Sequence, residues 1–193
     1  MDLTQGSAKE KNDRAKKMML WFGMVSLLMG FAGWTSAYIV SSTREDWASD
    51  VALPQAFLYS TLVIIISSLT YMLAKKAVKD GQSKKATLLL WVTLVLGVAF
   101  VSIQFVGFSQ MVAQGYYFTG PTSSIKMSYV FLIAMVHIVH VIAGMISLII
   151  VLYKQTKGRY TPKEYLGLAL GATFWHFLDL LWVYLVLFMT FVK

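Results

Sequence analysis

Residues 127–153 read MSYVFLIAMVHIVHVIAGMISLIIVLY, without a single Asp, Glu, Lys or Arg. A helix needs about 20 mostly apolar residues to cross a bilayer, and this run is long enough. On either side of it, four further runs of the sequence are also long and apolar enough to cross a bilayer. Within them, stretches such as Leu62-Val63-Ile64-Ile65-Ile66 do not alternate apolar and polar residues, as a lipid-facing barrel would. The pattern predicts an all-α, integral membrane bundle of five transmembrane helices over about 18–40, 55–74, 86–112, 127–153 and 167–192.

The overall composition supports a membrane protein. Of the 193 residues, 58% are hydrophobic and 13% are charged, against roughly 25% charged in a soluble domain. Such a composition excludes a disordered chain, and a soluble domain of this size could not bury so much apolar surface. There is no cysteine, which excludes disulfides, thiolate metal sites and a cysteine nucleophile.

The basic residues predict how the bundle is oriented. The 17 Lys and Arg residues divide as 5, 1, 5, 1, 4 and 1 over the amino terminus, the four loops and the carboxyl terminus. Positive charge marks cytoplasmic segments, so the amino terminus is predicted to be cytoplasmic and the carboxyl terminus outside. The net charge of +8 then reflects topology, and no nucleic-acid partner is expected.

The sequence predicts one membrane domain preceded by a polar amino-terminal segment. Residues 1–17 form a polar amino-terminal segment that we expect to be mobile. Residues 18–193 form a single five-helix membrane domain. The first apolar run is too long for a signal-peptide core and has no clear cleavage site after it, so we interpret it as a retained helix.

Small residues follow one side of the first predicted helix at spacings of 3, 4, 3 and 4. They are Gly23, Ser26, Gly30, Gly33 and Ala37. Membrane helices approach closely along such faces. The stripe is a candidate helix-packing face, either inside the bundle or for another subunit, and the fifth helix begins with a similar Gly167-x-x-x-Gly171.

Ionisable residues inside the spans form the candidate site. All three histidines lie there, His137 and His140 in the fourth helix and His176 in the fifth, together with Asp179. Ionisable groups in hydrocarbon are costly and usually face the interior and pair with one another. We therefore expect one buried polar network between the fourth and fifth helices, joined by Gln104 of the third.

Three interpretations of this network remain open. It could fix helix register through hydrogen bonds, act as a proton relay, or supply two axial ligands to a haem. A metal site is less favoured, because there is one carboxylate and no thiolate within reach. The sequence contains none of the catalytic motifs known from soluble enzymes. No catalytic, cofactor-binding or metal-ligating residue is therefore assigned.

Four segments resemble one known family. His137-Ile-Val-His140-Val-Ile-Ala-Gly144 resembles the H-x-x-H-V-x-x-G signature of subunit III of the haem-copper cytochrome oxidases. Residues 174–182, FWHFLDLLW, resemble its closing W-H-F-x-D-x-x-W helix. Leu96-Gly97, Phe100 and Gln104 resemble L-G-x-x-F-x-x-x-Q, and residues 31–38 resemble F-A-G-x-x-S-A-Y. The matches occur in order and cover four of the five spans.

The resemblance implies an accessory, non-redox subunit of a proton-pumping terminal oxidase that reduces oxygen to water. Such a subunit is expected to have no active site of its own, to pack directly against subunit I near subunit II, to bind phospholipid and to support proton uptake. Haem and copper are expected in the partner subunits. Five spans resemble the short form of the family, in an energy-transducing membrane such as the bacterial plasma membrane.

Two departures from the family pattern concern proton handling. The family usually has a glutamate where this chain has Leu27, and commonly one where it has Gly107. The alternative from another class is a b-type haem-anchor membrane subunit that uses His140 and His176 as ligands. A small transporter is less favoured, because such proteins usually show repeats or helices broken by glycine or proline, and these spans contain no proline.

Overall fold

The computed structural model describes residues 6–45, 47, 53–120 and 123–192. This part of the chain is all-helical, and its five helices are each long and apolar enough to cross a membrane. They are α1 (Ala8–Ser41), α2 (Gln55–Lys79), α3 (Ser83–Ala113), α4 (Ile125–Thr156) and α5 (Leu166–Phe191). The predicted fold class is therefore confirmed. Lys193 and the first five residues of the polar segment lie outside the described residues.

Helix α1 begins ten residues before its apolar run. Ser7 caps it: the Ser7 hydroxyl accepts from the Glu10 amide, and the Glu10 carboxylate accepts from the Ser7 amide. Such a capping box satisfies amide groups that would otherwise lack partners at the helix start. Residues 8–17 of the polar segment are consequently the first turns of α1, in line with its membrane span.

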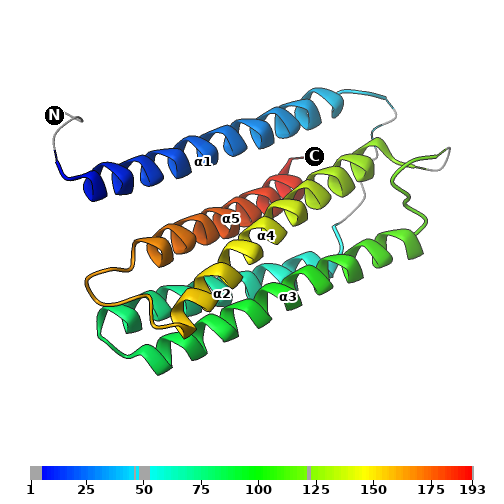
Figure 1. The fold of residues 1–193 in the computed structure, drawn as a ribbon. Coiled ribbons are helices and arrows are strands. Elements are labelled where there is room, and N and C mark those ends of the chain that lie inside the picture. The colour runs from blue at the N-terminus through cyan, green and yellow to red at the C-terminus, as the bar shows by residue number, and fades with distance from the viewer. Residues whose placement is uncertain (1–5, 46, 48–52, 121–122, 193) are drawn as a thin grey trace.

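The helices form a ring of four with a fifth at its side. α2 packs most extensively against α3, and further contacts join α3 to α4, α4 to α5 and α5 back to α2. Within the described chain, α1 packs against α4 and α5 only. Figure 1 shows α1 lying apart from the other four helices along much of its length.

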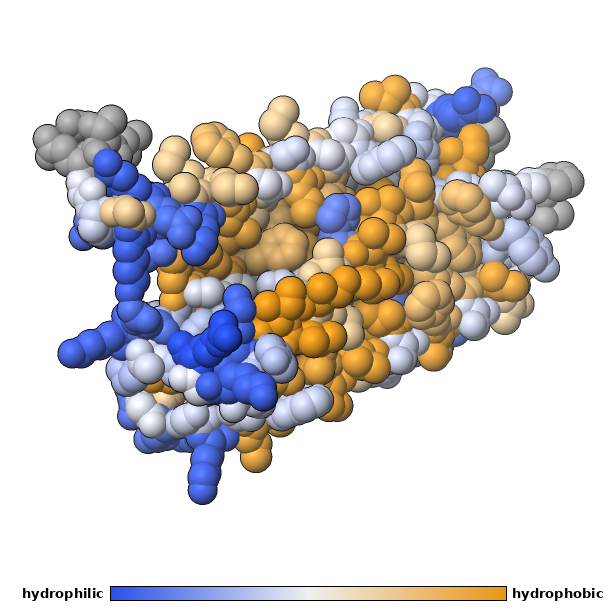
Figure 2. All heavy atoms as spheres, viewed as in Figure 1, coloured by the Kyte–Doolittle hydropathy of each residue, from blue (hydrophilic) through white to orange (hydrophobic). Residues whose placement is uncertain are grey.

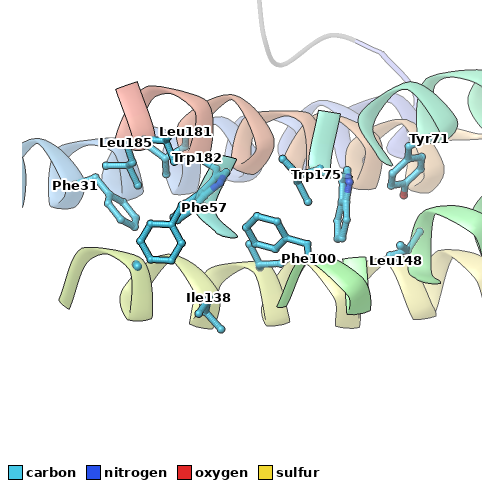
Figure 3. Close-up of a cluster of buried hydrophobic side chains, with 14 of the residues drawn as sticks. Phe31, Phe57, Tyr71, Phe100, Ile138, Leu148, Trp175, Leu181, Trp182 and Leu185 are labelled. Carbon is cyan, nitrogen blue, oxygen red and sulfur yellow. The ribbon is translucent and has the colours of Figure 1, made fainter. Parts of the chain in front are cut away.

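Large aromatic side chains fill the centre of the ring (Figure 3). Trp182 of α5 is fully buried and meets the rings of Phe57 and Phe100 edge-on, at centroid distances of 5.7 and 5.5 Å. Trp175 fills the next layer. Edge-to-face pairs of this kind add to the stabilisation that burial itself provides, so this layer fixes how α5 sits among α2, α3 and α4.

Close helix contacts depend on glycines inside the ring. A Cβ atom added to Gly97 would lie 2.9 Å from the Trp175 ring, and one added to Gly144 would lie 2.8 Å from Leu178. At Gly107 and Gly171 it would lie 2.6 Å from Phe57 and from the Tyr71 hydroxyl, respectively. Each of these glycines allows a side chain from a neighbouring helix to touch its backbone.

The glycines of the α1 stripe differ. A Cβ atom at Gly23, Gly30 or Gly33 would meet nothing within 4 Å. The buried face of α1 is instead formed by larger residues: Met24, Phe31, Thr35 and Tyr38. The stripe lies beside this face, so it does not provide close packing inside the described chain; packing against another subunit stays a prediction.

The surface separates into an apolar middle and one strongly basic end. Figure 2 shows hydrophobic side chains over the middle of the visible face and hydrophilic ones gathered at the end where Figure 1 places the amino terminus. The α2–α3 and α4–α5 loops lie at that same end, and these loops together with the helix turns that flank them carry most of the remaining Lys and Arg residues. The three basic segments of the sequence therefore meet at one end of the bundle.

Candidate functional site: polar groups between the helices

The polar pair on α5 faces α2. The His176 Nδ1 atom lies 2.6 Å from the Ser68 hydroxyl of α2. Asp179 is 5% exposed, and its Oδ2 atom has no hydrogen-bond partner among the described residues. The Ser68 hydroxyl of α2 thus joins α5 to α2 through His176.

Helix α2 supplies hydroxyls to two tryptophans and a glutamine as well. The Trp175 and Trp182 indole groups donate to Ser67 and Thr61, at 3.2 and 3.1 Å. Gln104 of α3 is fully buried and donates to Ser60, at 3.0 Å. Because buried donors need partners, these contacts fix α2 against both neighbours.

This role of α2 was not predicted from the sequence. Its hydroxyl residues, Ser60, Thr61, Ser67 and Ser68, recur at intervals of seven, which places them on one helix face. That spacing was the available signal. Small hydroxyl residues often join membrane helices by hydrogen bonds.

His137 lies in a closed aromatic box. It is fully buried, and its ring stacks on Trp182 at a centroid distance of 5.0 Å, with Phe31 and Phe100 edge-on at 6.1 and 6.2 Å. Neither ring nitrogen has a hydrogen-bond partner among the described residues. The imidazole therefore contributes to packing as an aromatic ring from α4, between α1, α3 and α5.

His140, one turn further along α4, lines a cavity between α1 and α4. The cavity has a volume of about 440 Å³, and its walls include Gly23, Ser26, Leu27, Gly30 and Trp34 of α1. The His140 Nδ1 atom lies 2.8 Å from the Val136 carbonyl oxygen. A carbonyl only accepts, so Nδ1 carries the proton in this contact.

The five predicted residues consequently occupy different interfaces. His176 and Asp179 face α2, His137 faces the core, His140 faces the α1–α4 cavity, and Gln104 bonds to α2. No hydrogen bond found in the described residues joins one of them to another. The expected common network between α4 and α5 stays a prediction, and the bonds that are present run to α2.

A basic hollow of about 740 Å³ lies between the amino-terminal turns of α1 and the α4–α5 loop. Its lining includes two acidic residues, Asp13 and Glu164, and a larger number of cationic ones. The cationic residues are Lys9, Lys16, Lys17, Lys154, Arg159 and Lys163. Lys9 donates to Glu164 across the hollow. This bond raises the pKa of Lys9 and lowers the pKa of Glu164, while burial raises the pKa of Tyr160 in the same loop.

The placement of the histidines does not favour the haem-anchor alternative. Two axial ligands must face one haem from opposite sides. His140 lines the α1–α4 cavity, whereas His176 is hydrogen-bonded to Ser68 of α2. Across the described ranges, no three His, Asp or Glu side chains come close enough to hold a metal ion together.

Comparison with known proteins identifies the family. Residues 49–192 match the family model of cytochrome c oxidase subunit III. The match spans α2 to α5, the four helices of the ring. The chain belongs to the cytochrome c oxidase subunit III family.

Individual relatives agree with this assignment. The chain is 34% identical to subunit 3 of the cytochrome bo(3) ubiquinol oxidase of Pseudomonas putida, over 64% of this chain and 58% of the relative. It is 32% identical to cytochrome c oxidase subunit 3 of Alkalihalophilus pseudofirmus, over 70% and 64%. With the subunit 3 of Corynebacterium diphtheriae it shares 27% identity over 86% and 82%. The chain spans about three fifths of the length of the Pseudomonas relatives it matches.

Proposed function

We propose that the chain is an accessory, non-redox subunit III of a haem-copper terminal oxidase. The observation that carries this proposal is the family match over α2–α5. In this function another subunit reduces oxygen to water, and the present chain stabilises that subunit and supports its proton uptake. The chain has no active site of its own and takes part in enzymatic turnover only within the complex.

The proposed partners are oxidase subunit I, in direct contact, and subunit II, with haem and copper held in those partners. Relatives are named as subunits of a ubiquinol oxidase and of cytochrome c oxidases. The electron donor of the complex that contains this chain is therefore a quinol or a cytochrome c. The described helices are apolar on their outer faces, as an integral subunit of an energy-transducing membrane requires.

We place the basic end of the bundle in the cytoplasm. The amino terminus and the α2–α3 and α4–α5 loops share that end, which agrees with the positive-inside rule. Several bacterial relatives support the plasma membrane of a bacterium as the location.

Bound phospholipid fits the basic hollow at this end. Its cations surround a space at the membrane surface where lipid phosphates lie. Basic pockets between membrane helices on the cytoplasmic side are suited to anionic headgroups. Lys154, in the last turn of α4, and Arg159, in the α4–α5 loop, are the residues that we expect to contact the phosphate.

His137, His140, His176, Asp179 and Gln104 act in this proposal as structural residues of the bundle. Replacing Asp179 with Asn, or His176 with Ala, should lower the amount of assembled complex more than the turnover of what assembles. Normal assembly with abolished oxygen reduction would instead favour a proton path through these residues.

The function is tested by purifying the tagged chain in a mild detergent and identifying the proteins that accompany it. We expect an oxygen-reducing subunit of about twelve helices and a copper-binding subunit. Recovery of the chain alone, or with a quinone-linked dehydrogenase, would contradict the proposal and would return the haem-anchor alternative to first place.

A further inference from the structure

The cavity between α1 and α4 has a polar group at an unusual depth. His140 is the midpoint of the predicted span 127–153, so it lies about 20 Å along the helix from either end. Gly30, on the opposite wall, is close to the middle of the span 18–40. Because the hydrocarbon core is about 30 Å thick, the cavity lies near the centre of the membrane.

The imidazole offers one hydrogen-bonding atom to this cavity. Nδ1 donates to the Val136 carbonyl, and Nε2 has no hydrogen-bond partner among the described residues. In the neutral ring, Nε2 is then an acceptor. The ligand that matches this acceptor is a molecule whose hydroxyl group donates a hydrogen bond at the centre of the membrane.

The walls of the cavity indicate the rest of that molecule. Gly23 and Gly30 leave a smooth wall on α1, and the aromatic side chains of Phe31 and Trp34 border it. A flat ring can lie against glycine backbone and aromatic edges without displacing side chains. The volume of about 440 Å³ is within the range of small-molecule sites.

Depth separates two kinds of amphiphile that carry hydroxyl groups in respiratory membranes. A phospholipid headgroup is held near the surface, about 15 Å from the centre, so its hydroxyls do not reach His140. An isoprenoid quinol is not anchored there and moves through the hydrocarbon core. Its reduced ring donates two hydroxyl hydrogen bonds, whereas the oxidised quinone has only carbonyl acceptors.

We infer that the α1–α4 cavity is a binding site for a membrane quinol, with a ring hydroxyl donating to His140 Nε2 and the ring against the glycine wall of α1. This inference rests on the proposed function, because it assumes a respiratory membrane with a quinol pool. It adds to that function a site on the accessory subunit that holds the reduced carrier in preference to the oxidised one.

The test uses the intact complex in nanodiscs, without oxygen and with cyanide, and a short-chain ubiquinol that carries an azido group. After illumination, labelled peptides are identified by mass spectrometry. We expect label on α1 between residues 23 and 34 and on α4 between residues 136 and 140. Excess unlabelled quinol should remove this label more effectively than excess quinone.

Variants locate the contact. His140→Phe should reduce labelling about fivefold, through loss of one hydrogen bond, and His140→Gln should retain more label because its carbonyl oxygen can still accept. Gly30→Leu fills the cavity and should abolish labelling. Ala32→Leu is the matched control: it enlarges an exposed side chain on α1, outside the small-residue stripe and away from the cavity lining, and should leave labelling unchanged.

Three results would overturn the inference: label confined to other segments, labelling insensitive to Gly30→Leu, or equal competition by phosphatidylglycerol, which would identify a phospholipid site. Co-purification of the oxidase and its haem spectrum are measured first on the same samples. An intact complex without label rejects the quinol site alone, whereas absence of the other oxidase subunits rejects the proposed function.

Discussion

Helix α1 and the four helices of the α2–α5 ring pack against their neighbours in different ways. In the ring, the glycines Gly97, Gly107, Gly144 and Gly171 each receive a side chain from a neighbouring helix. On α1, Gly23, Gly30 and Gly33 face open space, and a cavity lies between part of the helix and α4. The same residue type therefore marks tight packing in one region and an unfilled surface in the other.

The family model starts at residue 49 and covers the ring, whereas the alignment with the Corynebacterium diphtheriae relative covers 86% of the chain and so extends into α1. Toward its ends α1 is held by specific contacts: Lys9 to Glu164 at the basic end, and the Tyr38 hydroxyl to the Val192 carbonyl at the other. These contacts indicate a four-helix unit with a fifth helix that is held near both ends and, in its middle, by Phe31 against His137, beside the cavity.

The largest expected loss of stability comes from substituting the glycines inside the ring of helices. Gly144→Leu would force a side chain into Leu178 and Trp175, and overpacking of this kind should cost about 3 kcal/mol. Gly33→Leu on α1 should change stability by less than about 0.5 kcal/mol. Unfolding of the two variants in a denaturing detergent titration measures the difference, and equal losses would remove the distinction between the two regions.

The two positions where the family has glutamate should also respond differently. At Gly107 even a Cβ atom would lie 2.6 Å from Phe57, so Gly107→Glu should prevent accumulation of the protein in the membrane. Leu27 borders the α1–α4 cavity with His140, so Leu27→Glu has room and should accumulate normally. Immunoblots of membrane fractions check both. Normal levels of Gly107→Glu would show that the Phe57 contact is easily relaxed.

The hydrogen bond between His176 of α5 and Ser68 of α2 should give a smaller but measurable coupling energy between these two residues. Removing His176 and Ser68 separately and together, as His176→Ala and Ser68→Ala, forms a double-mutant cycle. Since their side chains lie 2.6 Å apart, the coupling energy should be about 1 kcal/mol. Thr173→Ala with Ser68→Ala serves as the control pair, because among the described residues the Thr173 hydroxyl bonds only to the Ala169 carbonyl of its own helix. Additive effects in the first pair would mean that the bond contributes nothing to stability.

The smallest effect concerns the exposed ion pair that fastens α1. Lys9 lowers the pKa of Glu164 below its ordinary 4.5 through a hydrogen bond. The stabilisation is therefore present above pH 4.5 and is lost as the pH falls through the lowered pKa. At the alkaline end, the raised pKa of Lys9 keeps the pair intact beyond 10.5.

Melting temperatures of the wild type and of Glu164→Gln, measured against pH, check this prediction. The difference should be small, should disappear in acid, and should shrink with added salt because both side chains are exposed. A difference that persists below the lowered pKa of Glu164 would assign the effect to another contact.

The sequence predicted the five helices well because each is set by a local property, a run of apolar residues of sufficient length. Helix ends were less predictable: α1 starts at Ala8 because Ser7 and Glu10 form a cap, which hydropathy does not register. The side chains near His176 and Asp179 were unpredictable for another reason. Spacing along α5 places both residues on one face but does not say which neighbour that face meets.

The tertiary arrangement decides that question. The indole side chains of Trp175 and Trp182 point into the centre of the four-helix ring. With α5 rotated in this way, His176 lies opposite Ser68 on α2. Similarly, the regular spacing of Gly23, Gly30 and Gly33 predicted a packing face, yet the larger residues Phe31 and Tyr38 take the buried side of α1.

The most direct test of the proposed function compares oxygen consumption by the complete oxidase with that of the same complex after this chain has been removed. An accessory subunit predicts that the depleted complex starts at a substantial fraction of the normal rate, then slows and inactivates earlier during turnover. Immediate and complete loss of oxygen consumption, with haem and copper retained, would contradict the account and assign this chain a part in the chemistry itself.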